Sequence, residues 1–191
     1  MSVCIRPSQP GATVFFTHVI AHRGDDLLTR HIDVLRAAVA ATLAERPFTV
    51  ESWVVLPDHL HAIWTLPEGD SDYATRWGAI KARFSMGLRR AGFGAPAELP
   101  IVVSGRYAGL KPGLRVGKRE AGIWQRRYWD HHIRDQADFD AHIRYCWGNP
   151  VKHGFVERAV DWPYSSIHRD IRLGRVEPEW AGVVQDGGFG E

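Results

Sequence analysis

Cysteine is scarce in this chain of 191 residues, which contains only Cys4 and Cys146. The two lie far apart in the sequence and do not form a CxxC pair. A disulfide framework and a thiolate zinc site each need more cysteines, or cysteines at shorter spacing. The sequence therefore indicates neither, and we expect the two thiols to be reduced and structural.

Long hydrophobic runs are also missing. No apolar stretch approaches the length needed to cross a bilayer, and the first residues, "MSVCIRPSQPGATVFF", contain no continuous apolar segment followed by a cleavage site. The composition, 45% hydrophobic and 24% charged, is that of an ordinary globular protein. We expect one domain over residues 1–191 and a cytoplasmic location.

The formal net charge is small, at +2, but the charges are unevenly distributed. Between Arg76 and Arg134 there are 13 Lys and Arg against three acids, a balance of +10 that leaves −8 elsewhere. Aromatic residues are interleaved in the same region, and cations alternating with rings suit phosphate contact and base stacking. A solvated basic surface over core aromatics explains the composition equally well.

Patterning predicts alternating strands and helices. Residues 12–22 and the two halves of "FTVESWVVLPDHLHAIWTL" read as strands, with a helix over 31–46 between them. A second helix starts at Asp72 or Thr75, and its exposed face carries Arg76, Lys81, Arg83, Arg89 and Arg90. A strand in "IWQRRYWDHHIRD" precedes a third helix, with Asp135 as N-cap and an end at Asn149-Pro150.

This order of elements predicts an α+β fold. The arrangement that fits is ferredoxin-like, an antiparallel sheet with helices packed on one face. The Gly, Pro and basic residues at about 92–122 interrupt the pattern and predict a mobile basic insertion. After about residue 180 we expect a flexible C-terminal tail.

Two spacings indicate chemistry. His59 and His61 are separated by one residue on a predicted strand, so both imidazoles project from one face and could bind one metal. Alone, the pair is more simply explained as two satisfied histidines in a sheet. Tyr145 and Asn149 lie four apart on a predicted helix, and the Asn149 amide oxygen would supply a third ligand. Two imidazoles, one oxygen and open positions suit Mg²⁺ or Mn²⁺ on a phosphate better than closed structural zinc.

The segments "PDHLHAIW", "GIWQRRYWDHHIRD" and "YCWGNPVKHGFV", in this order, resemble the REP-associated tyrosine transposases, relatives of the IS200/IS605 transposases in the HUH endonuclease group. The resemblance implies that His59 and His61 are the metal pair, Tyr145 the nucleophile and Asn149 the residue that completes the metal site. It further implies cleavage of single-stranded DNA near short palindromic hairpins, through a covalent 5′-phosphotyrosine. The implied partner is hairpin DNA, bound by a monomer or homodimer.

The remaining candidates have weaker signals. Tyr128 suits packing or base stacking, and His131 and His132, adjacent on a strand, should point to opposite faces. Phosphate contacts are expected from cations near the site and on the second helix, although a solvated basic rim is an equal alternative for each: Lys81, Arg83, Arg126, Arg127, Arg134 and Lys152.

Two other functional classes remain open at this point. A non-catalytic hairpin-DNA-binding protein would keep the fold but not the cleavage chemistry. A metal-dependent hydrolase could use His59, His61 and Asp58 on a small substrate, but that reading leaves the +10 region unexplained.

Overall fold

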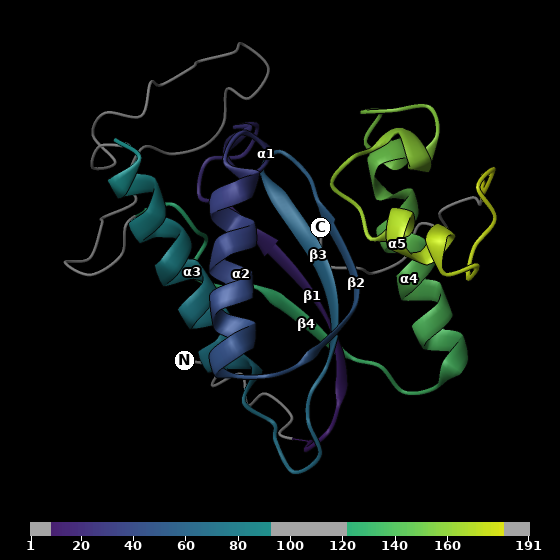
Figure 1. The fold of residues 1–191 in the computed structure, drawn as a ribbon, viewed down its shortest axis with the longest axis horizontal. Coiled ribbons are helices and arrows are strands. Elements are labelled where there is room, and N and C mark those ends of the chain that lie inside the picture. The colour runs from purple at the N-terminus through teal and green to yellow at the C-terminus, as the bar shows by residue number, and fades with distance from the viewer. Residues whose placement is uncertain (1–8, 93–121, 182–191) are drawn as a thin grey trace.

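The computed structural model describes residues 9–92 and 122–181 of the chain (Figure 1). The predicted insertion at about 92–122 and the tail after about 180 lie almost entirely outside these residues. Within the described ranges, no helix is long and apolar enough to span a bilayer.

A four-stranded antiparallel sheet forms the centre of the molecule. Its strands are β1 (Thr13–Val19), β2 (Thr49–Val55), β3 (His59–Thr65) and β4 (Trp129–His132), in the spatial order β2-β3-β1-β4. Every neighbouring pair is antiparallel. This is the strand order of the ferredoxin-like arrangement, so the predicted α+β fold is confirmed. β4 is shorter than expected, with only an isolated bridge between Ile20 and Trp124 before it.

Helices cover both faces of the sheet (Figure 1). After the short α1 (Leu27–Arg30), helices α2 (Ile32–Glu45) and α3 (Tyr73–Arg90) lie together on one face, as predicted. Helix α4 (Gln136–Lys152) lies on the opposite face, with a 3₁₀ turn at Ala159–Asp161 and helix α5 (Ile167–Arg172) beside it. The expectation of helices on one face therefore holds for α2 and α3 but not for α4.

Alternation along β3 explains why each face has its own core. Leu60 and Trp64 point toward α2 and α3, where the Trp64 ring stacks on Trp77 with centroids 4.1 Å apart. Ile63 points the other way and joins a second buried cluster with Phe15, Val54, Leu56, Tyr145 and Cys146. Burial raises the pKa of the Cys146 thiol to about 12, which fits the structural role expected for this cysteine.

Helix α4 does not end at Asn149-Pro150, so that prediction is wrong. Pro150 costs one helical hydrogen bond, but the amide of His153 still donates to the Asn149 carbonyl at 3.0 Å. Gly154, at φ 71°, then closes the helix: its amide donates to Val151, and that of Phe155 donates to Pro150, both at 2.9 Å. This Schellman motif stabilises the extra turn and keeps Lys152 on the same helix as Tyr145.

Arg76 is buried, contrary to its expected place on the exposed face of α3. Its guanidinium pairs with both carboxylate oxygens of Asp70, at 2.6 and 3.1 Å, and donates to the carbonyls of Arg46, Pro47 and Asp72. It thus ties the start of α3 to the end of α2. The hydrogen bond from Arg76 lowers the pKa of Asp70.

Arg76→Ala is expected to lower the free energy of unfolding by about 3 kcal/mol, because it removes one partner of a buried ion pair and leaves carbonyls without their donor. Urea denaturation measures the change. The pKa of Asp70 is lower in the folded than in the unfolded state, so its ionised carboxylate stabilises the fold at neutral pH. This stabilisation is lost as pH falls through the folded-state pKa. The difference in the free energy of unfolding between parent and variant should therefore become smaller in acid.

The exposed Arg89, on the same helix, supplies the control: Arg89→Ala should change stability by less than about 0.5 kcal/mol. Equal effects of the two substitutions would show that the Arg76 network does not hold the helices together.

Candidate metal and tyrosine site

His59 and His61 lie on the face of β3 that α4 covers, as their spacing predicts. Both are buried, with exposed fractions of 3% and 0%. Their ring centroids are 5.2 Å apart and the planes are nearly perpendicular, at 81°. The strand therefore brings two imidazoles together in a dry environment.

Each imidazole has an oxygen partner at Nδ1. Asp58 Oδ1 lies 2.6 Å from His59 Nδ1, and Thr17 Oγ1 lies 2.9 Å from His61 Nδ1. When Nδ1 donates to these oxygens, Nε2 keeps its lone pair, which is the tautomer of a metal ligand. This arrangement of outer oxygens behind both rings is typical of histidines that bind a cation through Nε2.

Asp58 is held as a carboxylate. Burial by itself would raise its pKa, but hydrogen bonds from His59 and from the Gly24 amide, at 2.8 Å, keep the pKa below its ordinary value. Thr17 comes from the neighbouring strand, where it pairs directly with His61 in the β1–β3 register. No local pattern around Thr17 signals this role, because it depends on strand pairing alone.

Helix α4 brings Tyr145 and Asn149 to the same place. Both are buried, and the Tyr145 ring lies edge-on to His61 with centroids 5.1 Å apart. The helix is fixed there by the second core cluster, in which Phe15 contacts both Tyr145 and His61, at 6.0 and 5.5 Å between centroids. One turn after Asn149, the His153 ring lies 4.9 Å from that of His59.

Lys152 lies against the tyrosine. Its Nζ lies 3.5 Å from the Tyr145 hydroxyl and 5.1 Å from the centre of the Tyr145 ring. This contact exists because α4 continues through Pro150. Among the residues expected to contact phosphate, Lys152 is therefore the one placed directly against the tyrosine.

The other expected phosphate contacts lie elsewhere. Arg126 and Arg127 are exposed in the loop before β4, and Arg134 is paired with Asp138 at 3.1 Å. On α3, across the sheet from α4, Arg83 donates to Thr42 and pairs with Glu45. Lys81 lies over the rings of Trp124 and Tyr128, at 5.4 and 5.3 Å.

The structure also shows what surrounds Tyr128 and the two adjacent histidines, His131 and His132. The Tyr128 ring stacks on His18, with centroids 4.3 Å apart, and packs against the core under α3 rather than under α4. This supports the packing role expected for it. His132 contacts Tyr73 on the α3 side, whereas His131 contacts Asp138 and His142 of α4, so the two do point to opposite faces.

His131, Asp138 and His142 form a group that sequence reasoning missed. Each offers one potential metal-ligand atom, and these atoms lie within 4.8 Å of one another. Two of the three, Asp138 and His142, have the i, i+4 spacing that puts side chains on one helix face. That spacing could have indicated the pair Asp138 and His142 from the sequence. It could not have indicated His131, which comes from β4.

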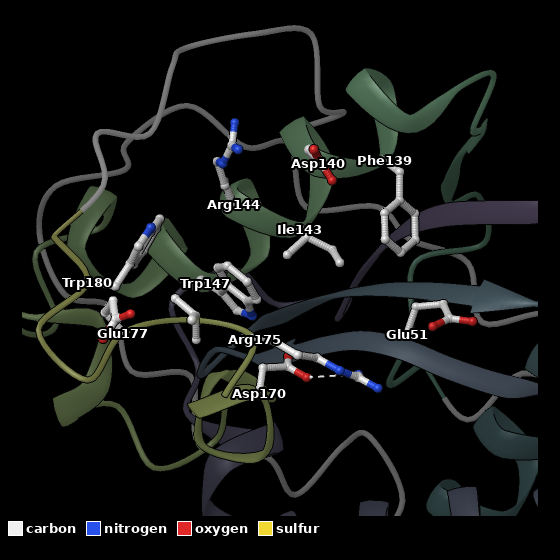
Figure 2. Close-up of a pocket in the computed structure, with 11 residues that line it drawn as sticks. Glu51, Phe139, Asp140, Ile143, Arg144, Trp147, Asp170, Arg175, Glu177 and Trp180 are labelled. Carbon is white, nitrogen blue, oxygen red and sulfur yellow. Dashed lines mark hydrogen bonds and ion pairs between the residues drawn. The ribbon is translucent and has the colours of Figure 1, made fainter. Parts of the chain in front are cut away.

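A cavity of about 600 Å³ lies between α4 and the C-terminal segment (Figure 2). On α4 it is lined by residues other than Tyr145 and Asn149, including Ile143 and Trp147. Its charged lining contains more carboxylates than cations, namely Glu51, Asp140, Asp170 and Glu177 against Arg144 and Arg175. This lining does not favour a phosphate backbone.

Comparison with known proteins identifies the family. The chain is 40% identical over 181 residues to a REP-associated tyrosine transposase of Escherichia coli K12, covering 95% of this chain and 92% of the relative. A relative from Haemophilus influenzae, provisionally named as one of the same family, is 38% identical over 95% of this chain and 94% of its own length. The chain therefore belongs to the REP-associated tyrosine transposases. No protein-family model matches it.

A solved structure supports the same assignment. It shows a REP-associated tyrosine transposase bound to a REP hairpin, and it is 39% identical to this chain, with a TM-score of 0.80. The match covers 100% of this chain and 98% of the other. The resemblance first indicated by three short segments thus extends over the whole fold.

Asp58→Asn is expected to weaken Mn²⁺ binding by about 10- to 100-fold, because a neutral amide no longer fixes the His59 tautomer. The change in affinity can be followed by electron paramagnetic resonance of free Mn²⁺ during titration. Asp33→Asn, at a carboxylate with 92% of its side chain exposed, is the matched control and should bind as the parent does. Unchanged affinity in Asp58→Asn would contradict the assignment of Asp58 as an orienting group.

Proposed function

We propose that this protein cuts and rejoins single-stranded DNA beside short palindromic hairpins, with Tyr145 as the nucleophile. The observation that carries the proposal is the packing of the Tyr145 ring on His61, with Asn149 one turn further along the same helix. Membership of the REP-associated tyrosine transposases supports it. Tyr128, by contrast, stacks on His18 in the core under α3.

A divalent cation would be held by His59 Nε2, His61 Nε2 and the Asn149 amide oxygen. The fit rests on Asp58 and Thr17, which engage both Nδ1 atoms and leave the Nε2 atoms as ligands. Mg²⁺ or Mn²⁺ suits a site with an amide oxygen and positions left for phosphate oxygens. When bound, the ion would polarise the scissile phosphate and spread its developing charge.

The residues of the chain supply the covalent chemistry. The Tyr145 oxygen attacks phosphorus, the bond from phosphorus to O3′ breaks, and a 5′-phosphotyrosine and a free 3′-OH result. The phenol loses its proton and the departing 3′ oxygen gains one, so the exchange conserves the phosphodiester-type bond and needs no ATP. A phenol has a reference pKa of about 10, so negative charge on its oxygen must be compensated, and the Lys152 ammonium lies beside that oxygen.

The expected partner is single-stranded DNA that carries hairpins. A related transposase has been seen bound to a REP hairpin, and this chain shares its fold along its whole length. Lys152 lies against the tyrosine and could contact a phosphate there, and the exposed Arg126 and Arg127 could contact phosphates from the loop before β4. Arg83 and Arg134 have acidic partners that DNA would have to displace. The geometry disfavours the small-substrate hydrolase, since Asp58 is occupied as the partner of His59.

Tyr145→Phe tests the nucleophile, because it removes one oxygen and keeps the buried ring. The variant is expected to fold, to bind Mn²⁺ and labelled hairpin DNA, and to form no covalent adduct. Denaturing gel electrophoresis detects the adduct in the parent protein, and peptide mapping identifies the linked residue.

Tyr128→Phe is the matched control, since it makes the same chemical change on the other side of the sheet, and it should still form the adduct. An adduct that persists in Tyr145→Phe, or that maps to Tyr128, would refute the assignment. A parent protein that binds hairpin DNA in Mn²⁺ but never becomes linked to it would instead favour the non-catalytic DNA-binding class.

A further inference from the structure

A second group of potential ligands lies on the same face of the sheet as the histidine pair. His131 Nε2 lies 2.9 Å from Asp138 Oδ2, and His142 Nδ1 lies 3.1 Å from Asp138 Oδ1. The two imidazoles stack, with centroids 4.7 Å apart and an angle of 12° between planes. One buried carboxylate thus holds two imidazoles, one from β4 and one from α4.

The spacing of these atoms is close to that of a metal site. Around a tetrahedral zinc ion, with bonds of about 2.0–2.1 Å, neighbouring ligand atoms are roughly 3.3 Å apart. The two separations between Asp138 and the histidines approach this value, and all three ligand atoms lie within 4.8 Å of one another. His142 Nδ1 also lies 2.8 Å from the Asp138 carbonyl oxygen, so cation binding requires this ring to release that contact.

The exposure of the three side chains and the hydrogen bonds to Asp138 fit a cation site. The side chains of Asp138 and His142 are 7% and 6% exposed, and that of His131 is 26% exposed, which leaves a route for entry. The amide and Nε of Arg134 donate to Asp138 Oδ2, at 3.0 and 3.1 Å, and orient the carboxylate from outside the site.

We propose that His131, Asp138 and His142 form a second metal site that binds Zn²⁺ and joins β4 to the first turns of α4. Two imidazoles and one carboxylate are a typical zinc ligand set, with water completing the coordination. Mg²⁺ prefers oxygen ligands, and Mn²⁺ binds nitrogen sites more weakly than Zn²⁺. The site is distinct from the histidine pair, because the Phe15 ring lies between them and contacts both His142 and His61.

This site would stabilise the helix that carries Tyr145. Asp138 is in the first turn of α4, and Tyr145 follows His142 by less than one turn. A cation that links these residues to His131 would oppose movement of α4 away from β1 and β4. The effect is structural and does not depend on the proposed DNA chemistry.

Zinc binding can be measured without the first site in the double variant His59→Ala/His61→Ala. The full-length, untagged protein is freed of metal with a chelator and titrated with Zn²⁺ by isothermal titration calorimetry. We expect one Zn²⁺ per chain and an increase in melting temperature on zinc addition. Adding His131→Ala or Asp138→Asn to this background should weaken binding by on the order of 100-fold and abolish the thermal shift.

His132→Ala is the matched control, because this neighbouring histidine points to the opposite face and should leave zinc binding intact. Circular dichroism checks that each variant is folded, and the partly exposed His131 makes that variant the safest to interpret. Absence of zinc binding in the double variant would overturn the proposal. Equal zinc affinity with and without His131 and Asp138, or equal loss in His132→Ala, would also overturn it. None of these outcomes depends on whether the protein cuts DNA.

Discussion

The packing of helix α4 against the sheet is the contact on which the candidate site depends. The histidine pair belongs to β3, whereas Tyr145 and Asn149 belong to a helix that begins more than seventy residues later in the sequence. The buried cluster around Phe15, Ile63 and Cys146 packs the two elements together. A shift of one helical turn would move Tyr145 by about 5.4 Å and separate its ring from His61.

Sheet register is the second requirement. Thr17 reaches His61 because β1 and β3 pair antiparallel with these two residues opposite each other. A slip of one residue would turn Thr17 to the other face and remove the oxygen behind His61. The hydrophobic alternation that buries Trp64 on one face and Ile63 on the other also fixes this register. The same physical pattern therefore stabilises the fold and orients the His61 ring.

The sequence was informative wherever a relation between residues is local. The i, i+2 spacing of His59 and His61, the i, i+4 spacing of Tyr145 and Asn149, and the caps Asp72 and Asp135 all follow from the geometry of a single element. Strand order was also predictable, because the alternation of helices and strands restricts the topology.

Relations that depend on tertiary contacts could not be read in the same way. Pro150 looks like a helix end, but a Schellman motif at Gly154 and burial of the helix allow one more turn. Arg76 looks like a surface cation until Asp70 and three carbonyls from the end of α2 and the start of α3 surround it. The roles of Thr17 and of the group formed by His131, Asp138 and His142 likewise require strand pairing and the docking of α4.

The central claim is that β3 and α4 together build one cation site beside Tyr145. The most direct measurement is anomalous diffraction at the manganese edge from crystals of the protein grown with hairpin DNA and Mn²⁺. We predict an anomalous peak bounded by His59 Nε2, His61 Nε2 and the Asn149 amide oxygen, next to the Tyr145 hydroxyl. A well-ordered site without manganese density between these three residues would contradict it.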